Sequence, residues 1–409
     1  MSFSQALSGL NAQREKLGAI GNNIANSQTV GFKSTSVQFA DVYAQSRIGL
    51  GVRNAAVMQD FSQGNVESSS RNMDLAIAGE GFFRFQQVNG EIGYSRNGQL
   101  TMTADGRLVN AQGAQIMGYP ADAEGNVQAG GNVQPMQVPP GDLQANATSQ
   151  LDISLNLNAG QPVITADFDA GNANTYNYST NATVFDSQGN ARNLSLYFTK
   201  TAPNAWNVNG QISGGPAGGG TYAVELGELT FNQNGTLAGG GATTFSLDGA
   251  AGAPEFGGDN PFAALNVGVS FEGSTQFAND STVNNTVQDG YASGSLVGIT
   301  IENDGTIMRN YSNEQSRASG QIALVSFRNP EGLNPRGDNL WTATAASGQE
   351  LINAPGTGLV GMIQAGATET SNVDLAQELV DMIIAQRSYQ ANSQTISTQD
   401  ELLQTIINL

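Results

Sequence analysis

Both ends of this chain carry the hydrophobic spacing of α-helices, whereas the long stretch between them alternates like β-strands. Near the start, Phe3, Leu10, Leu17 and Ile24 recur every seven residues. This spacing predicts an amphipathic helix over 3–24, because positions seven apart lie on one face of a helix. Such a pattern restricts the chain to folds in which its two ends are helical and its middle is a β structure.

The C-terminal pattern is longer. The apolar heptad positions there are Leu375, Met382, Tyr389, Ile396 and Leu403. They predict a second helix over 373–408, roughly 50 Å long against roughly 35 Å for the first. Ser2 with Gln5, and Ser371 with Asp374, have the spacing of capping boxes at the two helix starts.

Each helix has a thin apolar stripe, because polar residues occupy the neighbouring row. That row contains Arg14, Gly21, Gln386, Ser393 and Asp400. Isolated helices of this kind are marginal and gain stability by packing on another surface. Two interpretations stay open from the pattern alone: a helical hairpin that closes one globular domain, and a coiled coil that joins separate chains.

Between the ends the period of the pattern falls to two residues. Leu151 to Leu157 alternates as a half-buried strand. Segments 183–185 and 194–198 flank one predicted hairpin loop, and segments 296–301 and 306–308 flank another. Gln321 to Phe327 predicts a buried strand. Short strands at this spacing are typical of β-sandwiches and barrels.

The length of 409 residues favours two or three domains. A proline-rich stretch over 135–141 and a stretch rich in glycine and asparagine over 273–290 are the predicted connectors, and they bracket a middle domain. The glycine cluster at 214–220 lacks the Lys-Ser or Lys-Thr of a phosphate loop, so we expect a surface loop there.

The chain contains no cysteine and no histidine. Nucleophilic sites that depend on imidazole, and ordinary zinc sites, cannot be built without these residues. Carboxylate pairs and oxygen-ligand calcium sites remain, but the nearest calcium-like stretch, 167–172, lacks a third side-chain ligand and is expected to be a loop. We therefore expect no catalytic residue, no metal site and no cofactor.

The formal charge of −19 disfavours nucleic acid and anionic membranes as partners. The first residues have neither the basic cluster nor the apolar stretch of a secretory signal, and no apolar run is long enough to insert in a membrane. Composition alone would therefore predict a cytosolic protein.

Four sequence blocks, in order along the chain, resemble bacterial flagellar axial proteins, the family of rod, hook and hook-associated subunits. The blocks are NNIANSQTVGFK at 22–33, DLAIAGEGFF at 74–83, YSRNG at 94–98 with DGRLV at 105–109, and SNVDL at 371–375 with MIIAQRSYQAN at 382–392 and TQDE at 398–401. Within the family, the length and the large β insertion resemble hook members, as do segments 46–52 and 310–315. The shorter distal rod proteins are similar only at the ends.

The resemblance implies a multidomain α+β fold, mostly β, in which both chain ends form a helical coiled-coil domain and two β-rich domains are nested between them. It assigns 1–70 with 369–409 to the coiled-coil domain, 71–146 with 290–368 to a first β domain, and 147–289 to an outer β domain. Nesting of this kind follows from the resemblance and not from spacing.

The resemblance also implies a function. A hook subunit assembles with itself into a flexible hollow tube, a universal joint that passes torque from rod to filament. Its partners would be the distal rod protein, the hook cap, the hook-filament junction proteins and the flagellar type III export apparatus, with no insertion in a membrane. Because this export uses no cleaved signal, the expected location changes from the cytosol to the extracellular hook.

Under this interpretation the function lies in interfaces between subunits, and each candidate residue could equally belong to the core of a single chain. The candidates are Phe3, Leu7, Leu10, Leu17, Ile20, Asn22, Asn23, Ile24, Asn26, Gly31, Phe32, Leu375, Leu379, Met382, Ile383, Tyr389, Ile396, Leu403 and Ile407. Segment 29–70 either links the helical end to the first β domain and contacts neighbouring subunits, or is a disordered linker.

Two alternatives remain from sequence. One is a β-sandwich adhesin or carbohydrate-active enzyme that uses Asp167, Asp169, Asp186 and Glu225, although scattered acids on loops are usually just solvated. The other is a different axial protein, either the distal rod or a hook-filament junction subunit.

Overall fold

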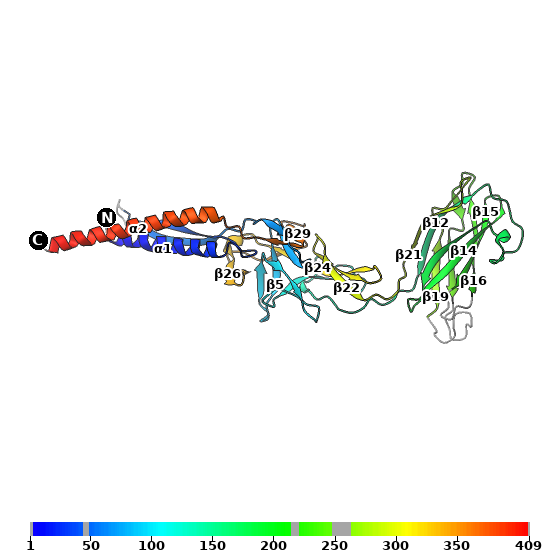
Figure 1. Cartoon of the computed structure of the whole chain (residues 1–409), viewed down its shortest axis with the longest axis horizontal. Helices are drawn as coiled ribbons and strands as arrows, with labels where there is room; N and C mark the ends of the chain where they lie inside the picture. The colour runs from blue at the N-terminus through cyan, green and yellow to red at the C-terminus, as the bar shows by residue number, and fades with distance from the viewer. Residues whose placement is uncertain (1–2, 44–48, 214–220, 248–262, 408–409) are drawn as a thin grey trace. The chain divides into compact units, whose positions relative to one another are not determined.

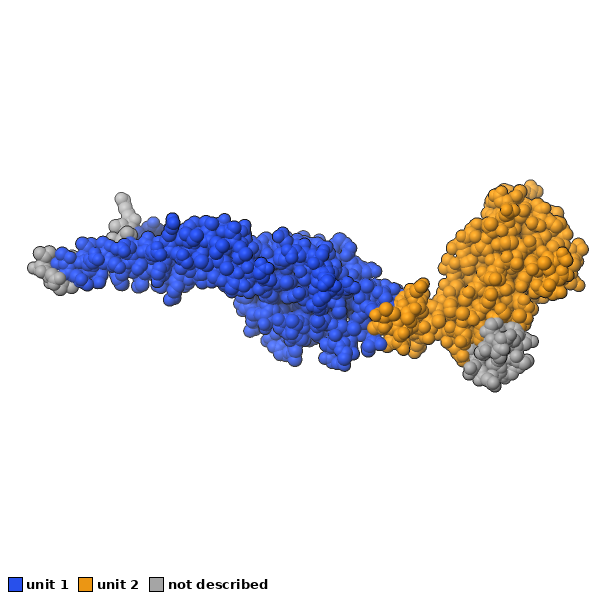
Figure 2. All heavy atoms as spheres, in the orientation of Figure 1, with its two compact units in different colours: residues 1–140, 298–310, 316–409 blue, residues 141–297, 311–315 orange. Residues whose placement is uncertain are grey.

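The computed structural model describes residues 3–43, 49–213, 221–247 and 263–407. The chain divides into two compact units, coloured separately in Figure 2. Unit 1 comprises residues 1–140, 298–310 and 316–409, and unit 2 comprises residues 141–297 and 311–315. The predicted fold class is confirmed: the chain is mostly β, and its N- and C-terminal helices pack together (Figure 1).

The terminal helices of unit 1 are α1 (Phe3–Ala25) and α2 (Leu375–Ile407). Both predicted helices are thereby confirmed, but the predicted cap of the second is wrong. Asp374, not Ser371, caps α2, because its Oδ1 accepts hydrogen bonds from the backbone N–H groups of Ala376 at 2.9 Å and Gln377 at 3.2 Å. Ser2, in the other predicted capping box, lies outside the described residues.

Segment 29–70 contains strands, so the hypothesis of a disordered linker is wrong for its described part. The strands β1 (Thr35–Val42) and β2 (Gly51–Gln59) form an antiparallel hairpin. Next along the chain, β3 (Val66–Ser68) pairs with β30 (Ala367–Glu369), which directly precedes the second helix. Part of the family-like segment 46–52 lies outside the described residues.

Two further sheets form the β part of unit 1. A small sheet contains β29 (Met362–Ala365), β4 (Asp74–Ala78) and β7 (Gly98–Gln99). The large sheet has the main order β22-β23-β24-β10-β5-β6-β27-β26, with β8, β9, β11, β25 and β28 attached to it. Its strands are β5 (Phe82–Gln86), β6 (Ile92–Ser95), β8 (Thr101–Met102), β9 (Leu108–Val109), β10 (Gln115–Pro120), β11 (Gln134–Pro135), β22 (Leu296–Ile301), β23 (Thr306–Tyr311), β24 (Ser316–Ile322), β25 (Leu324–Ser326), β26 (Asn334–Gly337), β27 (Leu340–Thr342) and β28 (Leu351–Asn353).

These sheets enclose apolar cores that contain the residues of the central family-like blocks. Leu75, Ile77 and Phe83 are fully buried in one core, and Phe82 and Trp341 lie in an adjacent aromatic cluster. The predicted hairpin of β22 and β23 is confirmed. The strand predicted over 321–327 is buried as expected, but it is divided at residue 323 between β24 and β25.

Unit 2 is a sandwich of two five-stranded sheets, as the spacing of strands predicts. One sheet contains β12 (Gln150–Asn158), β18 (Ala242–Leu247), β19 (Leu265–Ser270), β20 (Thr275–Phe277) and β21 (Thr282–Gln288). The other runs in order from β13 (Tyr178–Phe185) through β14 (Ala191–Ala202), β15 (Ala205–Ser213) and β16 (Thr221–Phe231) to β17 (Leu237–Gly239).

Alternating side chains from both sheets meet in one core, which includes Leu155, Leu196, Phe198 and Trp206. The loop predicted at 186–190 joins β13 to β14. Segment 273–290 is not a connector as predicted, because it contains β20 and β21, which both pair with β12. Segment 167–172 is a loop, and the glycine cluster at 214–220 lies outside the described residues.

Candidate assembly site

The two terminal helices lie antiparallel. Near the end of α1, Asn23 Nδ2 donates a hydrogen bond to Glu378 Oε1 in the first turn of α2, at 2.8 Å. Near the start of α1, a Cβ added at Gly9 would lie 3.0 Å from the side chain of Asn392, further along α2. The end of α1 thus meets the start of α2, and the start of α1 meets a later part of α2, so the two helices run in opposite directions. The start of α1 and the end of α2 lie at the same end of the helix pair (Figure 1).

One side of α2 faces α1. Asp381 forms an ion pair with Lys16 of α1 at 3.6 Å, and Ala385 is the one buried side chain that the structure describes in α2. At about 100° per residue, these two residues together with Glu378 and Asn392 lie within about 60° of one another around the helix axis. This narrow sector is the contact surface of α2 within the chain.

The opposite side of α2 is apolar and exposed. Leu379, Val380, Ile383 and Ile384 are 50%, 52%, 51% and 52% exposed. By the same rotation, they cover an arc of about 140° that is centred on the side away from α1. We call these four residues the α2 outer face. The helix pair buries little of this surface, so the outer face can be covered only by something outside it.

The predicted heptad row lies elsewhere on α2. Met382 and Ile396 are half-buried, while Leu375, Tyr389 and Leu403 are 39%, 40% and 52% exposed. This row borders the α1 side, whereas Val380 and Ile384 of the outer face were not predicted. Their sequence signal is a pair of adjacent apolar residues, 379–380, that recurs four residues later at 383–384.

The predicted residues of α1 are covered to different degrees. Ile20 is buried at 4% exposure, whereas Phe3 and Leu7 near the helix start are 53% and 45% exposed. Leu10, Leu17 and Ile24 are half-buried. The exposed apolar residues of α1 are therefore those farthest from the β part of unit 1, and Ile407 has a side chain outside the described residues.

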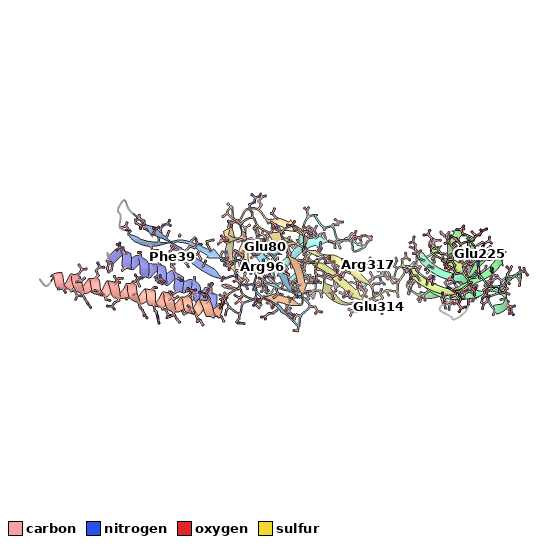
Figure 3. The ribbon with its side chains drawn as sticks, turned by 90° about the horizontal axis from the view of Figure 1, so that it is seen from above. Phe39, Glu80, Arg96, Glu225, Glu314 and Arg317 are labelled. Carbon is pink, nitrogen blue, oxygen red and sulfur yellow. The ribbon has the colours of Figure 1, made fainter. Side chains whose placement is uncertain are left out.

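The hairpin of β1 and β2 packs along α1. Ser8 Oγ accepts a hydrogen bond from the backbone N–H of Val52 at 3.2 Å. Asn54 Nδ2 donates to Glu15 Oε2 at 2.6 Å, about two turns further along α1. Helix α1 therefore lies between a β-hairpin and α2, which explains why it buries more of its surface than α2 does (Figure 3).

The asparagines at the end of α1 have different roles. Asn23 is 2% exposed and exchanges two hydrogen bonds of 2.9 Å with the backbone of Thr35, in addition to its bond to α2. Asn26 Nδ2 donates to both the carbonyl and the side-chain oxygen of Asn22. Asn23 thus fixes the hairpin and α2 to the end of α1, while Asn22 and Asn26 close the last turn.

Gly31 must be glycine. Its φ is +71°, and an added Cβ would lie 2.7 Å from the backbone nitrogen of Asn97. Its own N–H donates to the carbonyl of Glu369 at 2.8 Å. The adjacent Phe32 is half-buried and lines a cavity of about 520 Å³ together with Trp341. Gly31 therefore allows the start of the chain to approach both the β part and the strand that leads into α2.

A buried ion cluster joins the same segments. Lys33 Nζ lies 2.6 Å from Glu369 Oε1, and Arg96 Nη1 lies 3.2 Å from Glu369 Oε2, with all three side chains between 0% and 3% exposed. Burial lowers the pKa of Lys33 and of Arg96, and the Glu369 carboxylate opposes this. The cluster ties the segment after α1, the β part and the segment before α2 to a single carboxylate; Arg96 is labelled in Figure 3. Sequence analysis did not predict it, because charge pairing across 336 positions leaves no local pattern.

The acidic residues considered for catalysis do not gather into a site. Asp186 is fully buried and pairs with Arg192 at 2.8 Å, within the hairpin of β13 and β14. Asp167, Asp169 and Glu225 are exposed. No helix in the described part of the chain has the length and hydropathy of a membrane-spanning segment.

Family models match the chain along most of its length. They are the flagellar basal body rod protein at 4–33, the hook protein FlgE/F/G D1 domain at 76–158, the basal body protein FlaE D2 domain at 156–291, and the basal body rod FlgEFG C-terminal region at 364–409. The flagellar hook protein FlgE of Escherichia coli is 45% identical over 414 residues, covering 100% of both chains. The chain belongs to the flagellar hook protein FlgE family.

Other relatives agree. Hook protein FlgE of Salmonella typhimurium is 45% identical over 417 residues, and that of Borreliella burgdorferi is 32% identical over 442 residues, each covering 100% of this chain. The crystal structure of Helicobacter pylori hook protein FlgE2 superimposes with a TM-score of 0.53 at 16% identity, covering 74% of this chain and 100% of that one, so it shares the fold. As a FlgE protein, the chain is a structural, non-enzymatic subunit of the flagellar hook, an extracellular part of the flagellum, and it assembles with flagellar axial proteins.

Proposed function

We propose that this FlgE chain assembles with its own copies through the terminal helices into a flexible hollow tube, a universal joint that passes torque from rod to filament. The observation that carries the proposal is the α2 outer face. Leu379, Val380, Ile383 and Ile384 are each about half exposed and face away from α1. A contiguous apolar surface of this kind marks an interaction site, and in a homopolymer its partner is a neighbouring copy.

The remaining predicted interface residues are proposed to take part with the outer face. Phe3 and Leu7 on α1 and Leu375, Tyr389 and Leu403 on α2 are exposed enough to contact a neighbour. Asn23 and Gly31 would act indirectly, because both are buried and hold the helices in place. The proposed division has three parts: 1–70 with 369–409 for assembly, 71–146 with 290–368 as a first β domain, and 147–289 as an outer β domain.

The proposed partners beyond the chain itself are the distal rod protein, the hook cap and the hook-filament junction proteins. The type III export apparatus of the flagellum is the proposed route out of the cell. These proposals rest on membership of the hook family.

Truncation of the outer face tests the proposal. Leu379→Ala and Ile383→Ala keep a good helix former at exposed positions, so each should change the stability of the monomer by less than about 0.5 kcal/mol. Because Leu379 and Ile383 are already about half buried, burial of the rest between copies contributes roughly half of the 1.5–3 kcal/mol of full burial, so each change should raise the critical concentration for tube formation about fivefold. Sedimentation of assembled tubes measures this concentration.

Gln377→Ala is the matched control, because Gln377 is an exposed polar residue of the same helix that lies outside the arc of the outer face. It should leave the critical concentration within about twofold of the native value. Equal critical concentrations for Ile383→Ala, Leu379→Ala and the native chain would refute the assignment of this face to assembly.

A further inference from the structure

All the positive charge of unit 2 is buried. Residues 141–297 and 311–315 contain two basic residues, Arg192 and Lys200. Arg192 is 2% exposed and pairs with Asp186. Lys200 is 6% exposed, and its Nζ donates hydrogen bonds to the carbonyl oxygen of Ala159 at 2.6 Å and to that of residue 161 at 3.1 Å. The stretches of unit 2 outside the described residues contain neither lysine nor arginine.

The acidic residues of unit 2 that the structure describes are, in contrast, exposed, except Asp186, which is buried with Arg192. Unit 2 has 14 acidic and 2 basic residues, a formal charge of −12, against 21 acidic and 14 basic residues, −7, in unit 1. Asp152 on β12, Glu225 on β16, Glu272 after β19 and Asp167 in the loop before β13 are all exposed (Glu225 is labelled in Figure 3). The acids therefore come from both sheets and from the loops.

This distribution limits the contacts that unit 2 can make in a polymer of identical chains. An ion pair between neighbours needs an exposed cation on one of them, and unit 2 has none to offer another unit 2. Two such surfaces repel, and the repulsion reaches about 10 Å at an ionic strength of about 0.1 M. An attractive ion pair from unit 2 would have to end on a cation of unit 1 in another copy.

We propose that the surface of unit 2 repels its own copies. In the assembled hook, unit 2 of one copy meets unit 2 of its neighbour without ion pairs, and their like charge keeps the contacts between them loose. Screening by salt then tightens these contacts and stabilises the tube. The proposal rests on the assembly proposed above, and it adds a part for unit 2 that differs from that of the helices. The helices hold neighbouring copies together, while unit 2 resists close approach.

The test uses assembled tubes of the full chain and measures the temperature at which they dissociate, by light scattering. Native tubes should dissociate at a higher temperature at about 0.15 M salt than at about 0.01 M, where the screening lengths are about 8 Å and 30 Å. The variant Asp152→Asn, Asp167→Asn, Glu225→Gln and Glu272→Gln should dissociate at a higher temperature than native tubes at low salt. It should also lose much of the salt dependence.

The matched control removes four exposed charges from unit 1 by Glu67→Gln, Glu91→Gln, Glu124→Gln and Glu302→Gln. Its net charge changes by the same amount, but it should keep most of the native salt dependence. A second unit 2 variant, with Asp142→Asn, Asp169→Asn, Glu228→Gln and Asp280→Asn, should repeat the result of the first.

Two outcomes would overturn the proposal. A lower dissociation temperature of the unit 2 variants at low salt would mean that these acids attract cations of unit 1 in neighbouring copies. Equal shifts in the unit 2 and unit 1 variants would mean that total charge matters and the surface of unit 2 does not. If the native chain forms no tubes at either salt concentration, the assembly proposal itself fails, and this outcome is distinct from the other two.

Discussion

Unit 2 buries its apolar side chains within one chain, whereas the terminal helices leave many of theirs exposed. In unit 2, residues such as Leu196 and Phe198 are completely buried between two sheets of the same chain. In α2, Ala385 is the one buried side chain described, while Leu379 and Ile383 are about half exposed. Since helices of this kind gain their stability from packing, unit 2 is a self-contained fold, whereas the helices need neighbouring copies. The following predictions test this contrast, from the largest expected effect to the smallest.

The largest effect is expected at the buried ion cluster that anchors the helical ends. Glu369→Gln leaves Lys33 and Arg96 buried without a counter-charge, which should cost about 3–5 kcal/mol of unfolding free energy in unit 1. Each unit contains one tryptophan, so Trp341 fluorescence in a Trp206→Phe background reports unit 1 during urea unfolding.

The exposed Glu67 provides the control for this measurement. Glu67→Gln should change the unfolding free energy by less than about 0.5 kcal/mol. A loss below about 1 kcal/mol for Glu369→Gln would show that the cluster does not anchor the ends.

The same truncation should have different consequences in the two regions. Leu196→Ala removes a fully buried side chain from unit 2 and should cost about 2–5 kcal/mol. Leu379→Ala on the α2 outer face should cost the monomer less than about 0.5 kcal/mol. Trp206 fluorescence in a Trp341→Phe background measures the first, and loss of helix by far-UV circular dichroism measures the second. Similar losses of unfolding free energy for Leu196→Ala and Leu379→Ala would contradict the contrast between unit 2 and α2.

A smaller effect is expected at the helix cap. Asp374→Ala removes the acceptor of two backbone N–H groups at the start of α2 and should reduce stability by about 1 kcal/mol. Thermal melting followed by far-UV circular dichroism checks this. Glu401→Ala, an exposed change in the same helix, should melt within about 1 °C of the native chain. Identical melting of Asp374→Ala and the control would contradict the assignment of the cap.

The smallest effect concerns acid sensitivity in unit 2. Burial alone would raise the pKa of Asp289, but hydrogen bonds from Gln150 and Ser149 outweigh it and lower the pKa below 3.8. Asp289 therefore contributes stability above that pH, which is lost as the pH falls through the lowered value. Since the residue is exposed, we expect less than about 1 kcal/mol.

Asp289→Asn tests this contribution. Trp206 fluorescence should show that the unfolding free energy of the native chain exceeds that of the variant at about pH 5, and that this difference disappears by about pH 2. Asp280→Asn, at another exposed acid of unit 2, should leave the native pH profile unchanged. A constant difference between the native chain and Asp289→Asn across this range would contradict the assigned role of the carboxylate.

Much of the fold follows from local periodicity. The helices begin and end close to their predicted residues, and the predicted strands at 151–157 and 194–198 lie within β12 and β14 of unit 2. The prediction failed at 273–290, where polar side chains belong to strands on the surface of a sheet and not to a connector. A low content of apolar residues indicates exposure to solvent, and exposed strands share this composition with linkers.

The exposed apolar face of α2 was predicted less well than the fold. Heptad spacing located the correct helices, but it favoured residues such as Met382, which is half-buried beside α1, over Val380 and Ile384. The cluster around Glu369 could not be predicted, because a buried charge among distant residues depends on three-dimensional proximity alone. Which face of α2 is free becomes visible only when the partner helix is in place.

Limited trypsin digestion of the monomer and of assembled tubes, with mass spectrometry of the fragments, tests the central claim most directly. Arg14, Lys16 and Arg387 lie in the helices, whereas Arg192 and Lys200 are buried in unit 2 and act as an internal standard. We predict rapid cleavage in both helical ends of the monomer, protection of these ends in tubes, and resistance of unit 2 in both forms. Equal resistance of the ends in monomer and tube would contradict the account, because the helices would then be a preformed part of a globular unit.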